Sequence, residues 1–314
     1  MEKVIILGSG CAGYTAAVYT SRANLNPLLL AGVELGGQLA LTTDVENYPG
    51  FPSGIMGPVL MQMMKDQAEK FGTRIVYELA TEVDLSRKPF IVKTHDAVYD
   101  AQALIITTGS SPKKLNIPGE KEYSGYGVSY CATCDGAFFR NQDLIVIGGG
   151  DTAMEEAIFL TRYATKVYVV HRRDSLRASM IMQDRAFKNP KIEFIWDSAV
   201  TEVLSEDKKT VSAVKIQNLK TKKEIVKSAT GLFVAIGHNP NSGLFKGQLK
   251  MDENGYIITD DHQRTNIDGV FAGGDVQDHV YRQAVTAAGT GCAAAIEVER
   301  YLSALDHAER SKHS

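Results

Sequence analysis

Gly8-Ser9-Gly10-Cys11-Ala12-Gly13 is the stretch that decides the fold of this chain. It follows the short apolar run Val4–Leu7, and a helical pattern continues from about Ala12 to Arg22. A second apolar run, Leu28–Ala31, completes the order strand, glycine turn, helix, strand. In that context a G-x-G-x-x-G motif indicates a dinucleotide site, because glycines let the backbone approach a pyrophosphate and the helix N-terminus offers free N–H groups. We therefore expect the chain to open with a Rossmann-like domain.

The same pattern restarts about 140 residues later. The apolar run Asp143–Ile147 leads into Gly148-Gly149-Gly150-Asp151-Thr152-Ala153. A predicted helix over 152–163 and a predicted strand over Val167–Val170 complete the unit. Two copies of one fingerprint predict an α/β fold made of two Rossmann-like, three-layer ββα dinucleotide-binding domains.

The second domain is predicted to be inserted into the first. The C-terminal segment Gly269–Asp275 has no fingerprint of its own to serve, so we expect it to return to the N-terminal domain. The candidate crossings, Lys113–Gly119 and Gly237–Gly247, carry the Gly or Pro residues that are common at domain boundaries. The predicted domains are 1–112 with 246–314, and 113–245. Further predictions are helices at 56–71 and 281–305 and strands at 74–77, 82–85, 90–93, 103–107, 192–195, 211–216 and 232–235.

Composition and charge restrict the possible partners. Hydrophobic residues make up 44% and charged residues 23% of the 314 residues, and the net charge is -3. These values are ordinary for a soluble globular protein and give no reason to expect nucleic acid or a membrane as partner. The alanine-rich segment 284–305 is long enough to span a bilayer, but Glu297, Glu299 and Arg300 interrupt it. With no targeting segment visible and only four cysteines, a cytoplasmic protein is expected.

An arginine cluster follows the second fingerprint. Arg172, Arg173 and Arg177 begin about 20 residues after the glycines, where this fold reads the ribose of its nucleotide. An acidic residue there favours NAD, whereas arginines accommodate the 2′-phosphate of NADP through their planar guanidinium groups. The alternative is a solvated basic surface loop. After the first fingerprint no acidic residue ends the second strand, and Glu34 is the next candidate for a ribose contact.

Cys131-Ala132-Thr133-Cys134-Asp135-Gly136 lies between the two fingerprints. Two cysteines separated by two residues can close a readily reduced disulfide, and flanking dinucleotide sites can supply the electrons. A half zinc site or two unrelated thiols are the alternatives, but no second C-x-x-C or H-x-x-x-H occurs, so no metal is assigned. Asp135 can shuttle a proton to or from a thiol, or it can be a plain turn or capping residue. Cys11 and Cys292 are expected to be buried, small apolar residues.

Asp275 has two interpretations as well. It follows two glycines after an apolar strand, where a carboxylate can accept a hydroxyl hydrogen bond from the ribityl chain of a flavin. The alternative is an aspartate that caps the C-terminal helix.

With these residues considered together, the chain resembles the low-molecular-weight thioredoxin reductases over essentially its whole length. The C-A-T-C-D-G run combined with the downstream H-R-R is the most specific part of the resemblance. At Cys11 the family commonly has proline. The other matching motifs are Gly8-Ser9-Gly10, Gly36-Gly37-Gln38-Leu39, Glu46-Asn47-Tyr48-Pro49-Gly50, Gly148-Gly149-Gly150-Asp151 and Gly273-Gly274-Asp275-Val276.

The resemblance implies an NADPH-dependent thioredoxin-disulfide reductase, a homodimer with one FAD and one NADPH site per subunit. It implies that Cys134 lies against the flavin and that Cys131 attacks the disulfide of thioredoxin. The implied FAD contacts are Ser9, Gly10, Ala12, Gln38, Asn47, Val83, Asp275, Arg282, Gln283 and Ala284. The implied NADPH contacts are Gly149, Asp151, Thr152, Arg172, Arg173 and Arg177.

The implied cycle needs a moving domain. The cysteine pair and the nicotinamide site share one domain and cannot occupy the same flavin face at once, so the family likeness implies rotation on the two crossing strands. Three alternatives remain. The arginine cluster argues against a flavin dithiol oxidase that uses oxygen, and the cysteine pair argues against a ferredoxin–NADP reductase. A non-catalytic flavin-binding redox sensor is the third.

Overall fold

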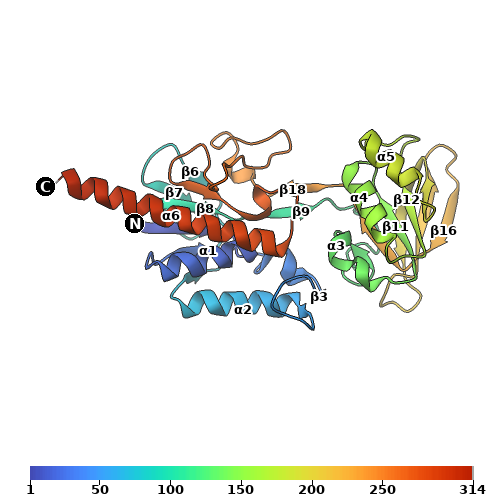
Figure 1. The fold of residues 1–314 in the computed structure, drawn as a ribbon, viewed down its shortest axis with the longest axis horizontal. Coiled ribbons are helices and arrows are strands. Elements are labelled where there is room, and N and C mark those ends of the chain that lie inside the picture. Colours follow the sequence, from blue (N-terminus) through green and yellow to red (C-terminus); the bar gives the residue numbers. More distant parts are fainter. Residues whose placement is uncertain (313–314) are drawn as a thin grey trace. The chain divides into compact units, whose positions relative to one another are not determined.

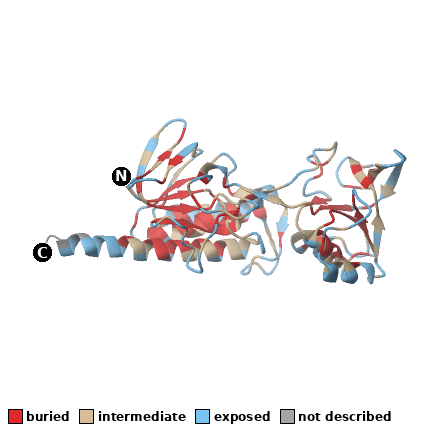
Figure 2. Cartoon of the chain, turned by 90° about the horizontal axis from the view of Figure 1, so that it is seen from above, coloured by how far each residue is buried: buried red, intermediate tan, exposed pale blue. Residues whose placement is uncertain are grey.

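The structure is a computed structural model that describes residues 1–312, and its contacts divide the chain into two compact units (Figure 1). Unit 1 comprises Met1–Ser111 and the described chain from Asn239 onward, and unit 2 comprises Pro112–His238. Unit 2 is therefore an excursion from unit 1 in the chain order. In each unit the buried residues gather in the strands and the helices that cover them (Figure 2).

The central sheet of unit 1 is built on β1 (Glu2–Leu7) and β8 (Val98–Ile106), which pair in parallel. Its path is β5-β2-β1-β8-β7-β6, and β19 pairs with the C-terminal half of β8. The pairs of β7 with β8 and with β6 are antiparallel. The remaining strands are β2 (Leu28–Leu30), β5 (Arg74–Val76), β6 (Glu82–Asp84), β7 (Phe90–Lys93) and β19 (Val270–Ala272).

Helices α1 (Cys11–Arg22), α2 (Gly57–Lys70) and α6 (Ala284–Lys312) pack on one face of this sheet (Figure 1). Helices α1 and α6 approach closely, because a Cβ on Gly291 would stand 2.2 Å from the carbonyl oxygen of Ala12. The sequence predicted a start of α6 near Tyr281 and an end near Leu305, and both ends differ. Arg282 has φ +47°, which an α-helix does not tolerate, so the helix begins only at Ala284.

Short elements complete unit 1. They are η1 (Gly37–Leu41), η3 (Gly243–Phe245), η4 (Gly274–Val276) and the antiparallel pair β3 (Asp44–Val45) and β4 (Ile55–Met56).

Unit 2 has three layers around the parallel sheet β10-β17-β11-β12-β13. Side chains alternate along β11 (Asp143–Ile147): Leu144 and Val146 pack on the helical layer, and Ile145 and Ile147 pack on an antiparallel β-layer. This arrangement confirms the three-layer ββα prediction. The other strands of the parallel sheet are β10 (Val128–Ser129), β12 (Lys166–Val170), β13 (Ile192–Ile195) and β17 (Gly231–Val234).

The outer layers of unit 2 were only partly predicted. The antiparallel layer consists of β14 (Ser198–Leu204), β15 (Ala213–Asn218) and β16 (Glu224–Ser228), of which only the middle strand was expected. The helical layer consists of α3 (Ala132–Asp135), η2 (Gly136–Phe138), α4 (Asp151–Leu160) and α5 (Met180–Phe187).

The segment in which the chain leaves unit 1 lies beside the segment in which it returns. Strands β9 (Ser110–Pro112) and β18 (His238–Pro240) form a two-stranded sheet. The N–H of Asn241 donates to the carbonyl oxygen of Gly109 at 2.9 Å, and the Thr108 hydroxyl donates to the carbonyl oxygen of Asn241 at 2.7 Å. The Asn241 amide returns a bond to the Thr108 carbonyl oxygen at 2.9 Å.

Candidate functional site

The first glycine turn is closed on one side and open on the other. A Cβ on Gly13 would stand 1.9 Å from the Gly8 carbonyl oxygen, so only glycine lets α1 begin this close to β1. Gly8 has φ +111°, which glycine alone adopts without strain. A Cβ on Gly10 would meet no protein atom within 4 Å. The turn therefore leaves its middle glycine facing free space, as a nucleotide-binding turn requires.

A second glycine loop folds onto this turn. The Ser9 hydroxyl donates to the Ala31 carbonyl oxygen at 2.8 Å and accepts the N–H of Gly36 at 3.2 Å. The loop continues into η1, which carries Gln38, an exposed residue. Ser9 thus links the end of β2 to the segment that was expected to contact FAD. Glu34 lies in the same loop and is exposed.

Asp275 provides a buried oxygen that lacks a partner. It lies in η4, nine residues before α6 begins at Ala284, so the prediction that it could cap that helix is wrong. Its Oδ1 atom is buried without a hydrogen bond. Burial raises the pKa of Asp275 to about 6, with Asp278 adding to the rise and Arg282 opposing it. A buried, unsatisfied carboxylate oxygen fits a hydroxyl-bearing ligand such as the ribityl chain of a flavin.

The residues at the start of α6 are brought beside the loop 46–52. The Asn47 amide donates to Gln283 Oε1 at 3.2 Å, which joins two predicted contacts that are far apart in the sequence. Arg282 donates to the His279 carbonyl oxygen at 2.6 Å. Ala284 is the first residue of α6, and Ala12 lies at the start of α1. The side chain of Val83, in contrast, packs into the core of unit 1.

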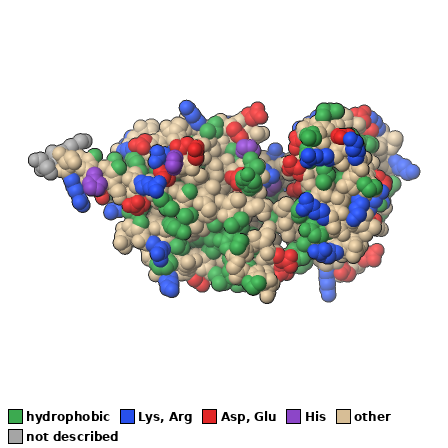
Figure 3. All heavy atoms as spheres, viewed as in Figure 1, with side chains coloured by type: hydrophobic (Ala, Val, Ile, Leu, Met, Phe, Trp, Pro, Cys, Tyr) green, Lys and Arg blue, Asp and Glu red, His purple; other side chains and the backbone are tan. Residues whose placement is uncertain are grey.

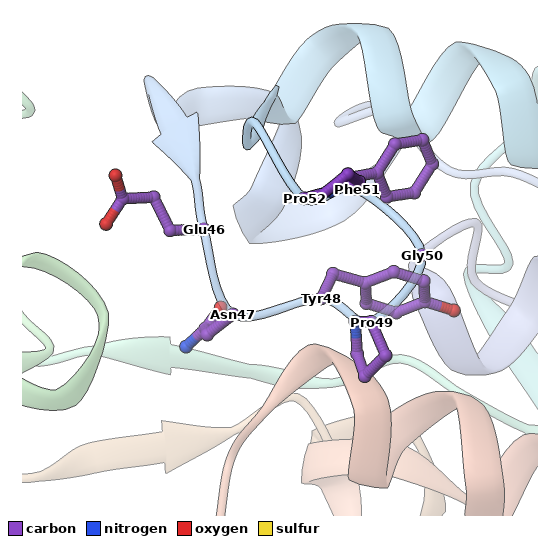
Figure 4. A pocket seen from close by; sticks show the side chains of 7 residues that line it. All are labelled: Glu46, Asn47, Tyr48, Pro49, Gly50, Phe51 and Pro52. Atoms are coloured by element: carbon purple, nitrogen blue, oxygen red, sulfur yellow. The ribbon is translucent and has the colours of Figure 1, made fainter.

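The loop itself forms a pocket of about 360 Å³, drawn in Figure 4. The rings of Tyr48 and Phe51 lie 6.3 Å apart, and the Glu46 carboxylate points away from them (Figure 4). Burial raises the pKa of Tyr48, and the nearby Cys11 adds to the rise. The pocket belongs to the matching motif Glu46–Gly50.

The second glycine turn repeats the design of the first. A Cβ on Gly149 would stand 2.2 Å from the His171 ring, whereas a Cβ on Gly150 would meet nothing within 4 Å. The carbonyl oxygen of Gly149 accepts the N–H of Arg177 at 2.7 Å. The arginine loop is therefore fastened directly to the turn. Burial lowers the pKa of His171 and so favours the neutral form of the ring beside the turn.

Arg172, Arg173 and Arg177 are exposed and form no ion pair with any residue in the described range 1–312. Three unpaired guanidinium groups beside an open glycine turn fit a phosphate. Asp151 and Thr152 open α4. The Asp151 carboxylate accepts the hydroxyl of Ser179 at 2.6 Å, and this hydrogen bond lowers its pKa.

Cys131 and Cys134 form a disulfide, with their Cα atoms 5.3 Å apart. Cys131 precedes the short helix α3, and its Sγ accepts the N–H of Cys134 at 3.2 Å. Asp135 is partly buried, and burial raises its pKa although the Ser129 hydroxyl opposes the rise. An acid with a raised pKa one residue after the pair favours the proton-shuttle interpretation over a plain turn residue.

Two polar residues that bond to the segment around the cysteine pair were not predicted from the sequence. Ser129 donates to Asp135 at 2.6 Å, and the carboxylate of Glu120 accepts the Tyr130 hydroxyl at 3.1 Å. Glu120 is 3% exposed and also accepts the N–H groups of Leu115 and Asn116. Single serines and glutamates carry no motif, so only their contacts reveal them.

None of the helices in residues 1–312 is long and apolar enough to cross a bilayer. Over the same range, no three His, Cys, Asp or Glu residues gather in a way that could hold a metal ion.

Comparisons with known proteins agree with this geometry. The family model described as pyridine nucleotide-disulphide oxidoreductase matches residues 2–291. The thioredoxin reductase of Rickettsia felis is 55% identical over 304 residues, which cover 96% of this chain and 98% of that protein. The thioredoxin reductase of Streptomyces coelicolor is 54% identical over 315 residues, which cover 99% and 97%.

Among solved structures, thioredoxin reductase from Streptococcus pyogenes superposes with a TM-score of 0.92 at 48% identity, covering 96% of this chain and 98% of that one. The open glycine turns, the unpaired arginines and the Cys131–Cys134 disulfide are the features that such an enzyme needs. The chain belongs to the pyridine nucleotide-disulphide oxidoreductases and, among them, to the thioredoxin reductases.

Proposed function

We propose that this enzyme passes two electrons from NADPH, through FAD and the Cys131–Cys134 disulfide, to the disulfide of a thioredoxin. The observation that carries the proposal is the position of the disulfide. It lies in the same compact unit as the glycine turn at Gly149 and the arginine loop, while a second open glycine turn lies in unit 1. The printed names of the relatives support thioredoxin as the substrate.

Unit 1 corresponds to the proposed FAD-binding domain, for which the sequence predicted the boundaries 1–112 and 246–314. Bound FAD would supply a carrier that accepts a hydride and releases two electrons. The open face of Gly10 and the unpaired Oδ1 of Asp275 support this assignment. The other proposed contacts are Ser9, Ala12, Gln38, Asn47, Val83, Arg282, Gln283 and Ala284.

Unit 2, Pro112–His238, corresponds to the proposed NADPH-binding domain, for which the sequence predicted the boundaries 113–245. Gly149 and Asp151 stand at the turn, and Thr152 follows on α4. The exposed guanidinium groups of Arg172, Arg173 and Arg177 are the proposed ligands of the 2′-phosphate. NADPH rather than NADH is therefore the expected donor.

The thiol chemistry follows from the two sulfur atoms. Two electrons enter the disulfide at Cys134, the S–S bond breaks, and both sulfurs are reduced. The Cys131 thiolate then attacks the disulfide of the partner and forms a mixed disulfide, and Cys134 attacks Cys131 to release the reduced partner. The two protons of the thiol pair leave with the product, and Asp135 moves one of them.

Domain rotation is part of the proposal. The disulfide and the NADPH-binding residues belong to one unit, so they must alternate at the flavin. Within the described chain, the paired strands β9 and β18 are the only two connections between unit 1 and unit 2. We propose that they form the hinge. A cross-link that fixes the two units in one orientation should abolish turnover. Full activity after cross-linking would reject rotation.

We further propose a cytoplasmic homodimer that pairs through unit 1. Figure 3 shows hydrophobic side chains gathered over α1 and α2. An exposed apolar patch of this kind is typical of a protein–protein interface. A reducible disulfide that must cycle fits a reducing compartment. The exposed apolar residues on α1, α2, α6 and the nearby loops include Tyr19, Leu41, Met56, Val59, Met63, Val285 and Ile296.

Cys131→Ser tests the proposed function. NADPH should still bleach the flavin absorbance of the variant, but thioredoxin reduction should fall to background, because the attacking thiol is gone. The matched control is Cys292→Ser, which alters a thiol outside the site and should retain both activities. Undiminished thioredoxin reduction by Cys131→Ser would remove this thiol from the mechanism.

A further inference from the structure

The Ser129 hydroxyl stands between the disulfide and its acid. Ser129 is the last residue of β10, and it is 4% exposed. Its oxygen accepts the N–H of Cys131 at 3.1 Å, and its hydroxyl donates to Asp135 Oδ2 at 2.6 Å. The Cys131 carbonyl oxygen is a second possible acceptor, but at 3.4 Å it is the poorer one.

A hydroxyl has a single proton, so its contacts fix its direction. The incoming N–H of Cys131 occupies a lone pair of the oxygen, and the proton then points at the nearby carboxylate. Within residues 1–312, Ser129 donates the only side-chain hydrogen bond to the Asp135 carboxylate, whereas the Asp135 backbone N–H donates to the Cys131 carbonyl oxygen at 3.1 Å. The hydroxyl therefore holds the Asp135 carboxylate in one orientation through Oδ2.

We propose that Ser129 is a positioning residue that orients Asp135 for proton transfer and stabilises its charged form. This inference rests on the proposed function, in which Asp135 moves a proton at the thiol pair. The hydroxyl connects the acid to the backbone of the attacking cysteine, so the two keep a fixed spacing while the S–S bond opens and closes. Ser129 lies outside the sequence motif C-A-T-C-D-G, which begins at Cys131.

The surroundings of Asp135 leave Ser129 as the controlling hydrogen bond. The elements that pack most extensively on α3 are η2, which is uncharged, and α4, which carries Asp151, Glu155 and Glu156. Burial raises the Asp135 pKa and the Ser129 hydroxyl lowers it, and no charge on α4 contributes to either direction. The carboxylate of Glu120 engages the Tyr130 hydroxyl instead.

The test uses the pH dependence of alkylation in the full-length, flavin-loaded enzyme after reduction with dithiothreitol. Iodoacetamide labelling of Cys131, read by mass spectrometry of its peptide, reports the thiolate, and the charge of Asp135 changes that thiolate fraction. The inflection that belongs to Asp135 is the one that disappears in Asp135→Asn. In Ser129→Ala this inflection should move to higher pH by about one unit, because the carboxylate loses a charge-assisted hydrogen bond.

Two matched variants keep the test decisive if alanine disturbs folding. In Ser129→Thr and Ser129→Val the new side chains have nearly the same shape, but only threonine keeps the hydroxyl. Threonine should retain the wild-type inflection and valine should shift it upward. The control Ser242→Ala deletes an equally buried serine of unit 1, whose hydroxyl bonds the Gly255 carbonyl oxygen at 2.6 Å, and it should leave the inflection unchanged.

The outcomes separate this inference from the proposed function. Alkylation needs only the dithiol form, so it does not depend on thioredoxin as substrate. An inflection that is the same in wild type, Ser129→Ala and Ser129→Val overturns the role of Ser129. The role of Ser129 is also overturned if Asp135→Asn removes no inflection from the wild-type alkylation profile. Failure to reduce thioredoxin, with the alkylation shift present, would reject the proposed substrate and leave the role of Ser129 standing.

Discussion

Replacing Asp275 by Asn should act in opposite directions on the cofactor-free protein and on flavin binding. In the cofactor-free chain, burial raises the Asp275 pKa from 3.8 to about 6. Its Oδ1 atom is buried with no donor to compensate the charge. A rise of this size corresponds to at most roughly 3 kcal/mol of unfavourable free energy for the ionised carboxylate.

The sign follows from the direction of the pKa change. Because the folded-state pKa is above the unfolded one, the stabilising contribution is complete below about pH 4 and is lost as the pH rises through about 6. At pH 8 the ionised carboxylate therefore destabilises the cofactor-free wild type. Asp275→Asn has no charge to bury, so it should exceed wild type in free energy of unfolding at pH 8 by up to about 3 kcal/mol.

Flavin binding should respond in the other direction. A ligand hydroxyl that donates to a carboxylate forms a charge-assisted bond of about 1.5–3 kcal/mol, and an amide oxygen accepts more weakly. Flavin affinity of Asp275→Asn should therefore fall by about 10- to 100-fold. Asp278→Asn is the companion variant, because it removes the neighbouring charge that raises the Asp275 pKa but keeps the Asp275 acceptor.

The assay is urea unfolding of deflavinated protein at pH 5 and pH 8, together with flavin titration followed by fluorescence quenching. The stability gain should be large at pH 8 and small at pH 5. The reasoning is refuted if the cofactor-free variant is less stable than wild type at pH 8. It is also refuted if the variant binds flavin as tightly as wild type.

Gly10→Ala should leave the melting temperature of the cofactor-free protein unchanged or slightly higher and should abolish flavin loading, because its Cβ would meet no protein atom but would enter the space left for the ligand. Gly13→Ala should instead destabilise the fold itself by about 1–3 kcal/mol or more, since its Cβ would stand 1.9 Å from the Gly8 carbonyl oxygen. Equal melting temperatures and equal flavin contents of the two variants would contradict the different roles of the two glycines. Arg172→Ala or Arg173→Ala should lower kcat/KM for NADPH by about 10-fold or more and leave NADH nearly unaffected, as expected when one charge-assisted phosphate bond is lost. Steady-state kinetics with both nucleotides checks this, and a parallel loss with NADH would argue against a 2′-phosphate site.

The parts of the fold that depend on local backbone chemistry could be predicted from the sequence. The two glycine turns require particular residues, and the buried parallel strands appear as continuous apolar runs such as Val4–Leu7. The prediction for β11, Asp143–Ile147, matches the structure at both ends. The cysteine pair was visible because its spacing alone brings the sulfurs within bonding reach.

The parts that depend on distant packing could not be predicted. Strand β16 is largely exposed, so its residues do not show the alternation of buried and exposed positions that marks a strand. The start of α6 was placed too early because the residue type of Arg282 gives no sign of its positive φ. The unsatisfied oxygen of Asp275 and the serine partner of Asp135 could not be predicted either, since a carboxylate in a sequence does not reveal whether a donor faces it.

Because the chain leaves and re-enters unit 1 at adjacent residues, Gly109 and Asn241, unit 2 is an insertion that could be exchanged as a whole. The strands that lead into and out of it are joined by direct hydrogen bonds, and within unit 2 the Lys113 N–H donates to the Gly237 carbonyl oxygen at 2.9 Å. A tight turn joining residues 111 and 239 would close the host, and the excised piece would begin and end at one point on its own surface. Recombination could therefore exchange the whole of unit 2, disulfide included, in a single event.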